Sequence, residues 1–385
     1  MNMLYLAMLE LKAIMTNSAV ALTVFGGVIF YSFLYPLPYA NQTPKQQKIS
    51  VVNLDKSQAS YQLERMVDAT PQVKVERRDH SIDAAKDALI THNNNGISGI
   101  LVIPEHFYKD LLLRKSPVLA YVGDASFFLV YGTIIEGLAN AGSTLAAEIK
   151  VSHLLTEGVP LAYAVNNISS VKLNMKPTFN ASMGYVQYVV PAVFVLILQQ
   201  TLAMAAGLMG GTQKSGQGYW RRYSSLKVFA IRTLILGSIY VFLSLYYFGV
   251  SFEMYGINRL ADISTIFAIL IPFLLSSCFI GIWLGAILPR RELVTFVVLI
   301  SSMPLIFSAG VIWPLEIIPS PIIWITSLFP STAAIQAFVH ANQMGASLQQ
   351  IIDKVLLLWG LTFLWGGLAF LSFKRSISRT NLSAG

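Results

Sequence analysis

Long stretches without a charged residue alternate along this chain with short charged clusters. The uncharged stretches cover residues 13–44, 177–213, 233–252, 263–289 and 355–373, and one more runs from 293 to 352 with only Glu316 inside it. A helix needs about 20 apolar residues to cross the hydrocarbon core of a bilayer. The pattern therefore predicts a polytopic α-helical membrane protein, and a composition that is 55% hydrophobic and 12% charged agrees with it.

Six transmembrane helices are predicted from this pattern. They are Ala19–Tyr39, Gly184–Met209, Lys227–Val250, Ser264–Leu288, Leu293–Trp313 and Val355–Phe373. Lys and Arg are retained on the cytoplasmic side of a membrane, and they gather at the N-terminus, at every second loop and after the last span. Both termini are therefore predicted to be cytoplasmic. The net charge of +8 reflects this topology and not a nucleic-acid partner.

The two ends of the chain are predicted to lie on the cytoplasmic side. Residues 1–18 are expected to form a helix at the membrane interface, because their apolar side chains share one helical face. These side chains are Leu4, Met8, Leu11 and Met15. Residues 374–385 are predicted to form the cytoplasmic tail.

Arg232 lies near the inner end of its span, where its side chain is expected to reach the headgroups.

Residues 40–183, between the first and second spans, form a block long enough to fold by itself. Strand-like and helical patterns alternate in it, which predicts an extracytoplasmic α/β domain with long helices. The predicted strands are Ile49–Leu54, Val73–Glu76, Ile97–Ile103 and Val118–Val122, and the long helices run through Phe127–Leu155. Its histidines have no Cys or carboxylate at ligand spacing, so neither a catalytic site nor a metal site is predicted.

Three segments of the chain carry a resemblance to a known family. Gly99–Phe107 has the form G-x-x-x-I-P-x-x-F, and Val51–Ser57 ends a strand with Asp-x-Ser. A proline-rich segment follows the fifth span and includes Trp313, Pro314, Pro319, Pro330 and Thr332. With one span, a large outer domain and five more spans, the chain resembles the type-2 ABC-exporter permeases.

The resemblance implies the permease subunit of an ATP-driven ABC exporter, which is not itself an enzyme. Because the path through the spans would be apolar, the expected substrate is amphipathic or lipid-like, such as a drug or a lipid, and it would move out of the cytoplasm or the inner leaflet. ATP and Mg would bind a separate cytoplasmic ABC ATPase, and this chain would hold no cofactor. Gly210–Ser215 is not a P-loop, because no Gly precedes its Lys and it follows a span instead of a strand.

The resemblance also implies a location and further partners. The chain would lie in the bilayer of the bacterial plasma (inner) membrane, as a homodimer or with a homologous second permease. The outer domain would cap the exit or dock a periplasmic membrane-fusion adaptor. The loop 211–226 would carry the coupling helix that contacts the ATPase. Its contact residues would be Tyr219, Trp220, Arg221, Arg222 and Tyr223, although Trp, Tyr and Arg at a boundary are also ordinary membrane anchors.

Polar residues inside the spans indicate where substrate would pass, since such groups are costly in a bilayer. The expected path residues in spans two and five are Gln199, Gln200, Ser301, Ser302 and Phe307. Hydrogen bonds between helices explain the polar ones equally well. Residues 314–335 are expected to form an outer gate, as re-entrant or interfacial short helices, or else an apolar loop. The gate residues are Trp313, Pro314, Glu316, Pro319 and Pro330.

Two other functions remain open from the sequence. A membrane-anchored receptor or sensor would bind a ligand or a partner through the outer domain. A secondary transporter would show inverted repeats and charges in mid-membrane, which the sequence does not display. The exporter reading is therefore the working hypothesis, with the receptor as its alternative.

Overall fold

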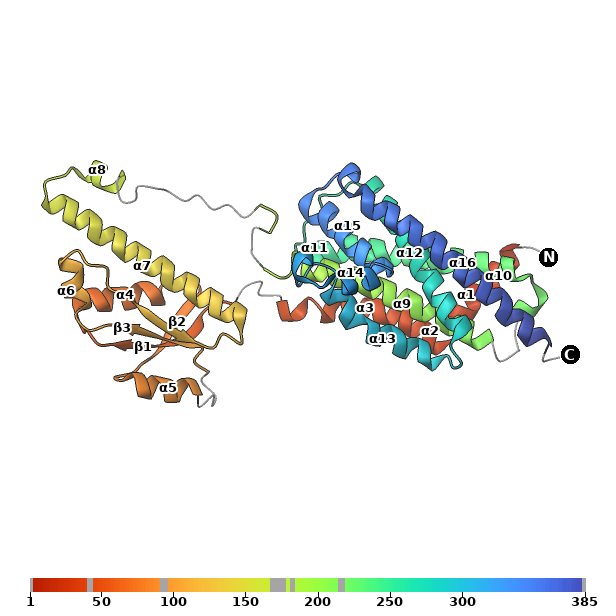
Figure 1. Cartoon of the computed structure of the whole chain (residues 1–385), viewed down its shortest axis with the longest axis horizontal. Coiled ribbons are helices and arrows are strands. Elements are labelled where there is room, and N and C mark those ends of the chain that lie inside the picture. The colour runs from red at the N-terminus through yellow and green to blue at the C-terminus, as the bar shows by residue number, and fades with distance from the viewer. Residues whose placement is uncertain are drawn as a thin grey trace. The chain divides into compact units, whose positions relative to one another are not determined.

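The chain divides into two units, and each is described by itself (Figure 1). Residues 41–176 form the first, here called the α/β unit, and residues 1–40 with 177–385 form the second, here called the membrane unit. The computed structural model describes residues 3–39, 44–90, 96–166, 178–180, 184–213 and 219–382.

The α/β unit is built on a four-stranded sheet with the order β2-β1-β3-β4. The strands are β1 (Gln47–Asn53), β2 (Val73–Arg78), β3 (Gly99–Ile103) and β4 (Ala120–Gly123). The first three are parallel, and β4 runs antiparallel to β3. Parallel neighbours need crossover connections, which α4 (Gln58–Asp68) and α5 (Ile82–Ile90) provide. The short helix α6 (Phe107–Leu112) leads into β4.

Helices cover both faces of this sheet (Figure 1). Alternation along β1 sends Ile49 and Val51 to the face packed by α4 and by α7 (Phe128–Thr156). The same alternation sends Val52 to the face packed by α5, against Ala85. All five residues of β3 are buried, as expected for a central strand covered on both sides. The short helix α8 (Leu161–Asn166) follows α7.

Among its described residues, the membrane unit contains five helical stretches long and apolar enough to cross a bilayer. They are Ser18–Tyr39, Val189–Gly211, Ser225–Met254, Ile263–Ile287 and Leu348–Ser376. The first consists of α2 (Ser18–Ala21), a π-helical segment (Leu22–Gly27), α3 (Val28–Leu34) and a final 3-10 turn (Leu37–Tyr39). The others are built on α9 (Val189–Gln213), α10 (Ser225–Leu245), α12 (Ile263–Ile287) and α16 (Ile352–Leu382). The third stretch ends through a π-helical segment (Tyr246–Ser251) and α11 (Phe252–Met254).

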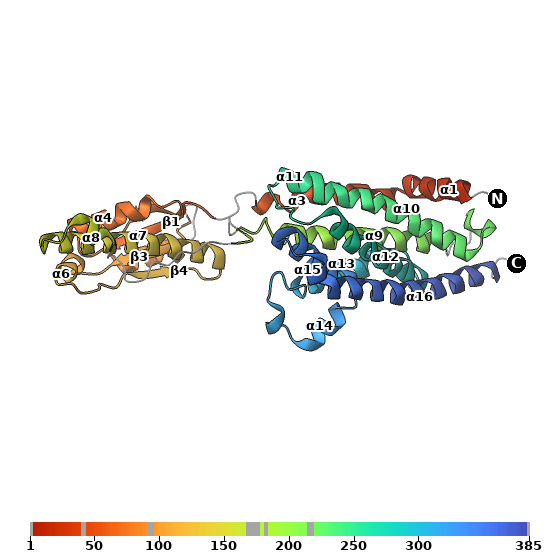
Figure 2. The same cartoon turned by 90° about the horizontal axis from the view of Figure 1, so that it is seen from above.

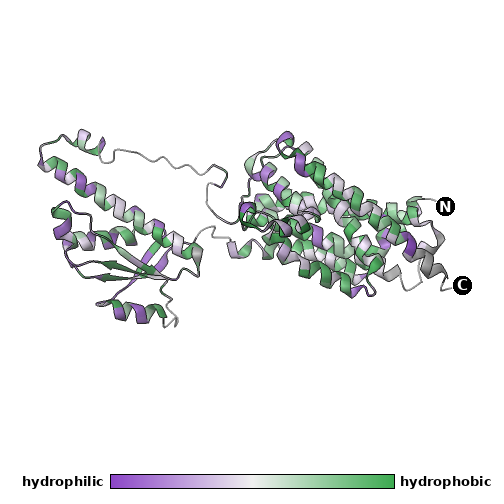
Figure 3. Cartoon of the chain, viewed as in Figure 1, coloured by the Kyte–Doolittle hydropathy of each residue, from purple (hydrophilic) through white to green (hydrophobic). Residues whose placement is uncertain are grey.

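Further helices complete the membrane unit. They are α1 (Met3–Thr16), α13 (Glu292–Phe307), α14 (Ser320–Thr326) and α15 (Pro330–Met344). Helices α14 and α15 are together long and apolar enough for one span, but their axes are bent by 94° at the break between them. Apolar residues dominate the long helices of the membrane unit (Figure 3). The protein is a polytopic helical membrane protein.

Helix α9 forms the centre of the membrane unit, since 89% of the apolar segment that would cross the bilayer is buried. It packs backbone to backbone against α12, where Gly281 lies on Ala203 and Gly285 lies on Gly207. A Cβ atom at either α12 glycine would come closer to the α9 carbonyl oxygen than real Cβ atoms do. Small residues spaced four apart allow this approach, as in other helix pairs within membranes.

The structure corrects the predicted end of the fifth span. The prediction was Leu293–Trp313, whereas α13 ends at Phe307 and has 16 residues. The chain turns at Gly310, whose φ of +82° belongs to the left-handed region that favours glycine. A side chain there would also press on Leu315. The sequence signal missed this turn because Ala309–Ile312 is as apolar as the helix before it.

Candidate functional site

A cavity of about 220 Å³ lies between α9, α12 and α13, in the interior of the membrane unit. Three of the predicted path residues line it, namely Gln199, Gln200 and Ser301. Apolar and aromatic side chains form the rest of the wall, including Trp283, Phe329 and Trp365. The cavity therefore has an apolar wall with a few amide and hydroxyl groups, which suits an amphipathic molecule.

The two glutamines differ in what they do. The Gln199 side chain, 5% exposed, accepts a hydrogen bond from the backbone N–H of Ser331 at 2.5 Å. Ser331 lies in the first turn of α15, whose N–H groups have no partner within the helix. Gln199 therefore holds the start of α15 in place, whereas Gln200 reaches α13 and donates to the Ser302 hydroxyl.

The other predicted path residues lie beside the cavity or away from it. Ser302 is hydrogen-bonded to Gln200 and also donates to the Val298 carbonyl at 3.1 Å. Phe307 does not line the cavity, and its side chain is 46% exposed at the end of α13. The structure thus places Gln199, Gln200 and Ser301 around the cavity, joins Ser302 to Gln200, and leaves Phe307 outside.

The predicted outer gate segment folds into short helices joined by prolines. Pro314 precedes the 3-10 turn Leu315–Ile317, which contains Glu316. Pro319 precedes α14, and Pro330 opens α15. Trp313 on this segment is 52% exposed. Helix α15 is buried along most of its length, whereas Trp324 and Ile325 of α14 are exposed, so the two arms of the bend meet different surroundings.

A buried ion pair joins the N-terminal helix to α10. The Arg232 guanidinium donates to both carboxylate oxygens of Glu10, at 2.9 Å from Nη2 and 3.2 Å from Nε. Both side chains are 0% exposed. The Arg232 guanidinium also lies 5.9 Å from the centre of the Phe373 ring on α16. The pair therefore links α1, α10 and α16, and Figure 2 shows α1 alongside α10.

This ion pair corrects one expectation, which concerned the Arg232 side chain. Arg232 was expected to extend toward the headgroups, but Glu10 of α1 satisfies it inside the protein. The face of α1 with Leu4, Met8, Leu11 and Met15 is exposed, and the opposite face packs on α10 with Leu6, Glu10 and Ile14 buried. The signal in the sequence was a lone acidic residue in an apolar helix, together with an arginine inside a span.

The segment predicted to contact an ATPase lies next to this ion pair. Tyr219–Arg222 forms one 3-10 turn. Burial raises the pKa of Tyr219, the Glu10 charge raises it further, and Arg232 opposes that effect. Trp220 is 9% exposed and belongs to the membrane-unit core, with Tyr219 and Tyr223 packed against that core. Residues 214–218 and the side chains of Arg221 and Arg222 lie outside the described part of the chain.

Across the described ranges, no group of three or more His, Cys, Asp or Glu side chains could hold a metal ion. The geometry brings together a tight α9–α12 contact, a polar cavity beside it and a buried ion pair next to the following loop. Such an arrangement can transmit a displacement of the loop to the helices around the cavity.

Comparison with known families gives one match, to the family described as ABC-2 family transporter protein, over residues 18–371. The matched range includes the α/β unit as well as the predicted spans. No curated protein matches the chain.

Proposed function

The chain belongs to the ABC-2 family of transporter proteins, and from this premise we propose that it is the permease subunit of an ATP-driven exporter. It moves an amphipathic or lipid-like substrate out of the cytoplasm or the inner leaflet. The family match along nearly the whole chain is the observation that carries the proposal. Members of this family work with an ABC ATPase, so ATP hydrolysis is assigned to a separate chain.

The proposed orientation rests on the distribution of basic residues. The start of α1 and the end of α16 lie at one end of the membrane unit (Figure 1). Exposed basic side chains lie in the second half of α1, in the turn between α12 and α13, and near the end of α16. They include Lys12, Arg290, Arg291, Lys374 and Arg375. Because basic residues are retained inside, we assign this end to the cytoplasm and the α/β unit to the extracytoplasmic side of a bacterial inner membrane.

The proposed path runs through the cavity between α9, α12 and α13. The ATPase acts on the loop after α9, and Trp220 and Tyr219 transmit the displacement because they pack into the core beside the Glu10–Arg232 pair. Motion of α9 then changes the cavity, since Gln200 connects α9 to α13. The substrate class follows from the mixed apolar and amide lining.

The proposed second permease packs against the outward face of α13. Phe296, Ile300 and Met303 on this face are each more than 60% exposed, while the opposite face packs on α9. A cysteine at Ile300 tests this assignment by cross-linking between copies in native membranes, with Phe242→Cys on α10 as the control. A cross-linked dimer from Ile300→Cys alone supports the interface. Equal cross-linking at both positions contradicts it.

The experiment that tests the whole proposal is purification of the chain from its host with identification of the chains that remain bound. We expect an ATPase with a P-loop, and its loss on the double charge reversal Arg221→Glu with Arg222→Glu. Lys374→Glu with Arg375→Glu is the matched control, because it reverses two charges at the same end of the bundle.

Each outcome has a distinct meaning. An ATPase lost only in the loop variant supports both the class and the coupling site. An ATPase retained in both variants keeps the class but moves the coupling site. Absence of any ATPase, under conditions that preserve other ABC complexes, overturns the exporter and favours a receptor that binds ligand through the α/β unit.

A further inference from the structure

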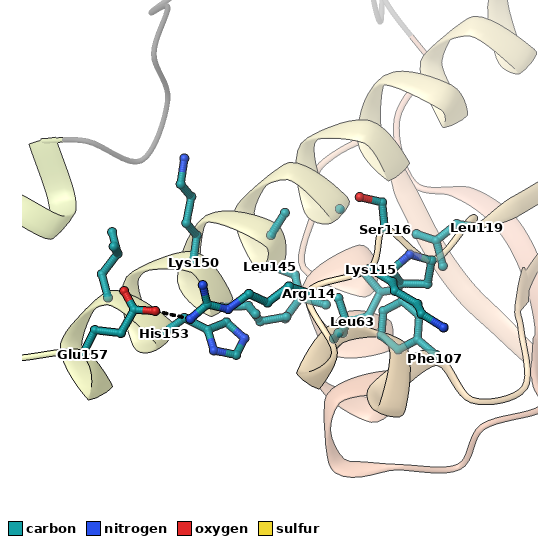
Figure 4. A pocket seen from close by; sticks show the side chains of 16 residues that line it. Leu63, Phe107, Arg114, Lys115, Ser116, Leu119, Leu145, Lys150, His153 and Glu157 are labelled. Carbon is teal, nitrogen blue, oxygen red and sulfur yellow. Dashed lines mark hydrogen bonds and ion pairs between the residues drawn. The ribbon is translucent and has the colours of Figure 1, made fainter.

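A cavity lined by both apolar and charged side chains lies within the α/β unit. It measures about 500 Å³ and lies between the second half of α7 and the segment that connects α6 to β4 (Figure 4). This volume is within the range of about 300–1,000 Å³ typical of small-molecule sites. We call it the α7 pocket.

The floor of the α7 pocket is the core of the unit itself. Leu63 of α4, Phe107 of α6 and Leu145 of α7 line it and are at most 4% exposed. Leu111, Leu119 and Ile149 extend the apolar wall as partly buried residues on the same core. An apolar cavity lowers the stability of a folded protein in proportion to its volume. A core that binds no ligand is therefore expected to pack its side chains into such a space. An apolar chain inserted there would restore the missing contacts.

The rim of the α7 pocket is mostly cationic. The cations Arg114, Lys115 and Lys150 line it together with the imidazole of His153, and Glu157 is the only carboxylate among the lining residues. Arg114 forms an ion pair with Glu157, and His153 lies beside them (Figure 4). Lys115 lies 3.7 Å from Asp110. Arg114 and Lys115 are 64% and 66% exposed, so they stay solvated and can exchange partners at little cost.

From this geometry we propose that the α7 pocket binds a single-chain amphiphile with a carboxylate or phosphate headgroup. The alkyl chain lies on Leu63, Phe107 and Leu145, and the headgroup lies among the cations of the rim. Burial of the chain supplies the affinity, at about 25 cal/mol per Å² of apolar surface. The cations make binding selective for anions, and they make the affinity decrease as the salt concentration rises. The binding is independent of transport, and only its role in export rests on the proposed function.

The test uses the full-length chain in nanodiscs of phosphatidylcholine. A dodecanoate that carries a photoreactive diazirine is cross-linked, and the labelled peptides are mapped by mass spectrometry. We expect label within residues 107–119 and 142–157. Unlabelled dodecanoate and dodecyl phosphate should compete, and dodecyltrimethylammonium should compete at least about tenfold more weakly, which corresponds to about 1.4 kcal/mol.

Two variants separate the pocket from general partition into the bilayer. Ala146→Trp places a ring in the α7 pocket from an exposed position on α7, and it should reduce labelling of these peptides about tenfold. Ser152→Trp on another face of α7 is the control and should label as wild type. Label confined to the membrane spans, or label in the pocket peptides that Ala146→Trp does not change, overturns the proposal.

A charge variant keeps the test decisive if Ala146→Trp does not fold. Lys115→Gln with Lys150→Gln should weaken competition by dodecanoate severalfold and leave competition by dodecanol unchanged. Lys109→Gln on α6, which does not line the pocket, is the matched control. Equal losses for both competitors would contradict a headgroup contact at the rim.

A last arm identifies the source of the ligand. A photoreactive lysophosphatidylglycerol held in the bilayer presents a phosphate anion on a single acyl chain, as free dodecyl phosphate presents one on a single alkyl chain. Pocket labelling by this lipid supports binding of a membrane lipid, whereas pocket labelling by dodecanoate alone supports a soluble amphiphile. Because no arm involves an ATPase, failure of binding leaves the exporter proposal standing.

Discussion

The two units of this chain place their polar and apolar side chains in opposite ways. The α/β unit buries Leu63, Leu101 and Ile103 and keeps most of its charges outside. The membrane unit buries Glu10 and Arg232 and exposes large apolar side chains. Among the latter, Leu22, Phe242 and Phe363 are 71%, 74% and 75% exposed. The difference shows that each unit is folded for a different solvent.

Different forces therefore hold the two units together. In water, removal of apolar surface drives the α/β unit to pack its sheet against helices. Between helices in lipid this driving force is absent, because lipid tails are as apolar as leucine. Close backbone contact, as between Gly281 and Ala203, and polar pairs such as Glu10–Arg232 take its place.

The largest effect is expected at the buried ion pair. Arg232→Met leaves the Glu10 carboxylate without a partner inside the membrane unit, and should lower the free energy of unfolding by about 3–5 kcal/mol. Unfolding in mixed detergent micelles measures it. The double variant Glu10→Met with Arg232→Met removes both charges and should recover most of the loss. A single-variant effect below about 1 kcal/mol would show that water reaches the pair.

The next effect compares the apolar side chains of the two units. Leu101→Ala in β3 should lower the stability of the α/β unit by about 2–5 kcal/mol, because the side chain is 1% exposed and leaves a cavity. Phe242→Ala in α10 should change stability within about 0.5 kcal/mol, since the side chain faces the surroundings in either case. Hydrogen exchange of peptides from each unit measures both. A large loss from Phe242→Ala would show that a protein partner covers α10.

The third effect concerns the close contact of α9 and α12. Gly281→Ala forces the two backbones apart and should cost about 1–3 kcal/mol. The control is Gly237→Ala in α10, where an added Cβ meets nothing within 4 Å. That change should stabilise the helix by up to about 1 kcal/mol. Micelle unfolding again measures both, and similar results for the two glycines would show that the contact opens in the folded protein.

The sequence predicted the features of this protein that depend on local pattern. Uncharged stretches indicated the helical membrane fold, which the family match and the apolar helices confirm. Short runs of β-branched and apolar residues marked Ile49–Leu54 and Ile97–Ile103, and strands lie at Gln47–Asn53 and Gly99–Ile103. Such signals require no knowledge of distant neighbours.

Features that depend on distant partners were not predictable in this way. Glu10 meets Arg232 only because α1 packs on α10, and a helix with apolar residues on two faces does not reveal which face packs. The α7 pocket likewise combines Leu63, Arg114 and Lys150 from three separate segments. Gln199 and Gln200 are adjacent in sequence, yet one supports α15 and the other reaches α13.

The smallest effect is expected at the ion pair of the α/β unit, and it sharpens the comparison most directly. Glu64 is 3% exposed, but its partner Arg78 is 61% exposed, and Glu64 also accepts a hydrogen bond from Asn53 at 2.8 Å. Arg78→Gln should therefore cost only about 0–1 kcal/mol, because water and Asn53 still serve the carboxylate. Thermal unfolding of the α/β unit, followed by exchange of its peptides, measures this. A loss as large as that of Arg232→Met would mean that exposure of one partner to water does not explain the difference between the two pairs.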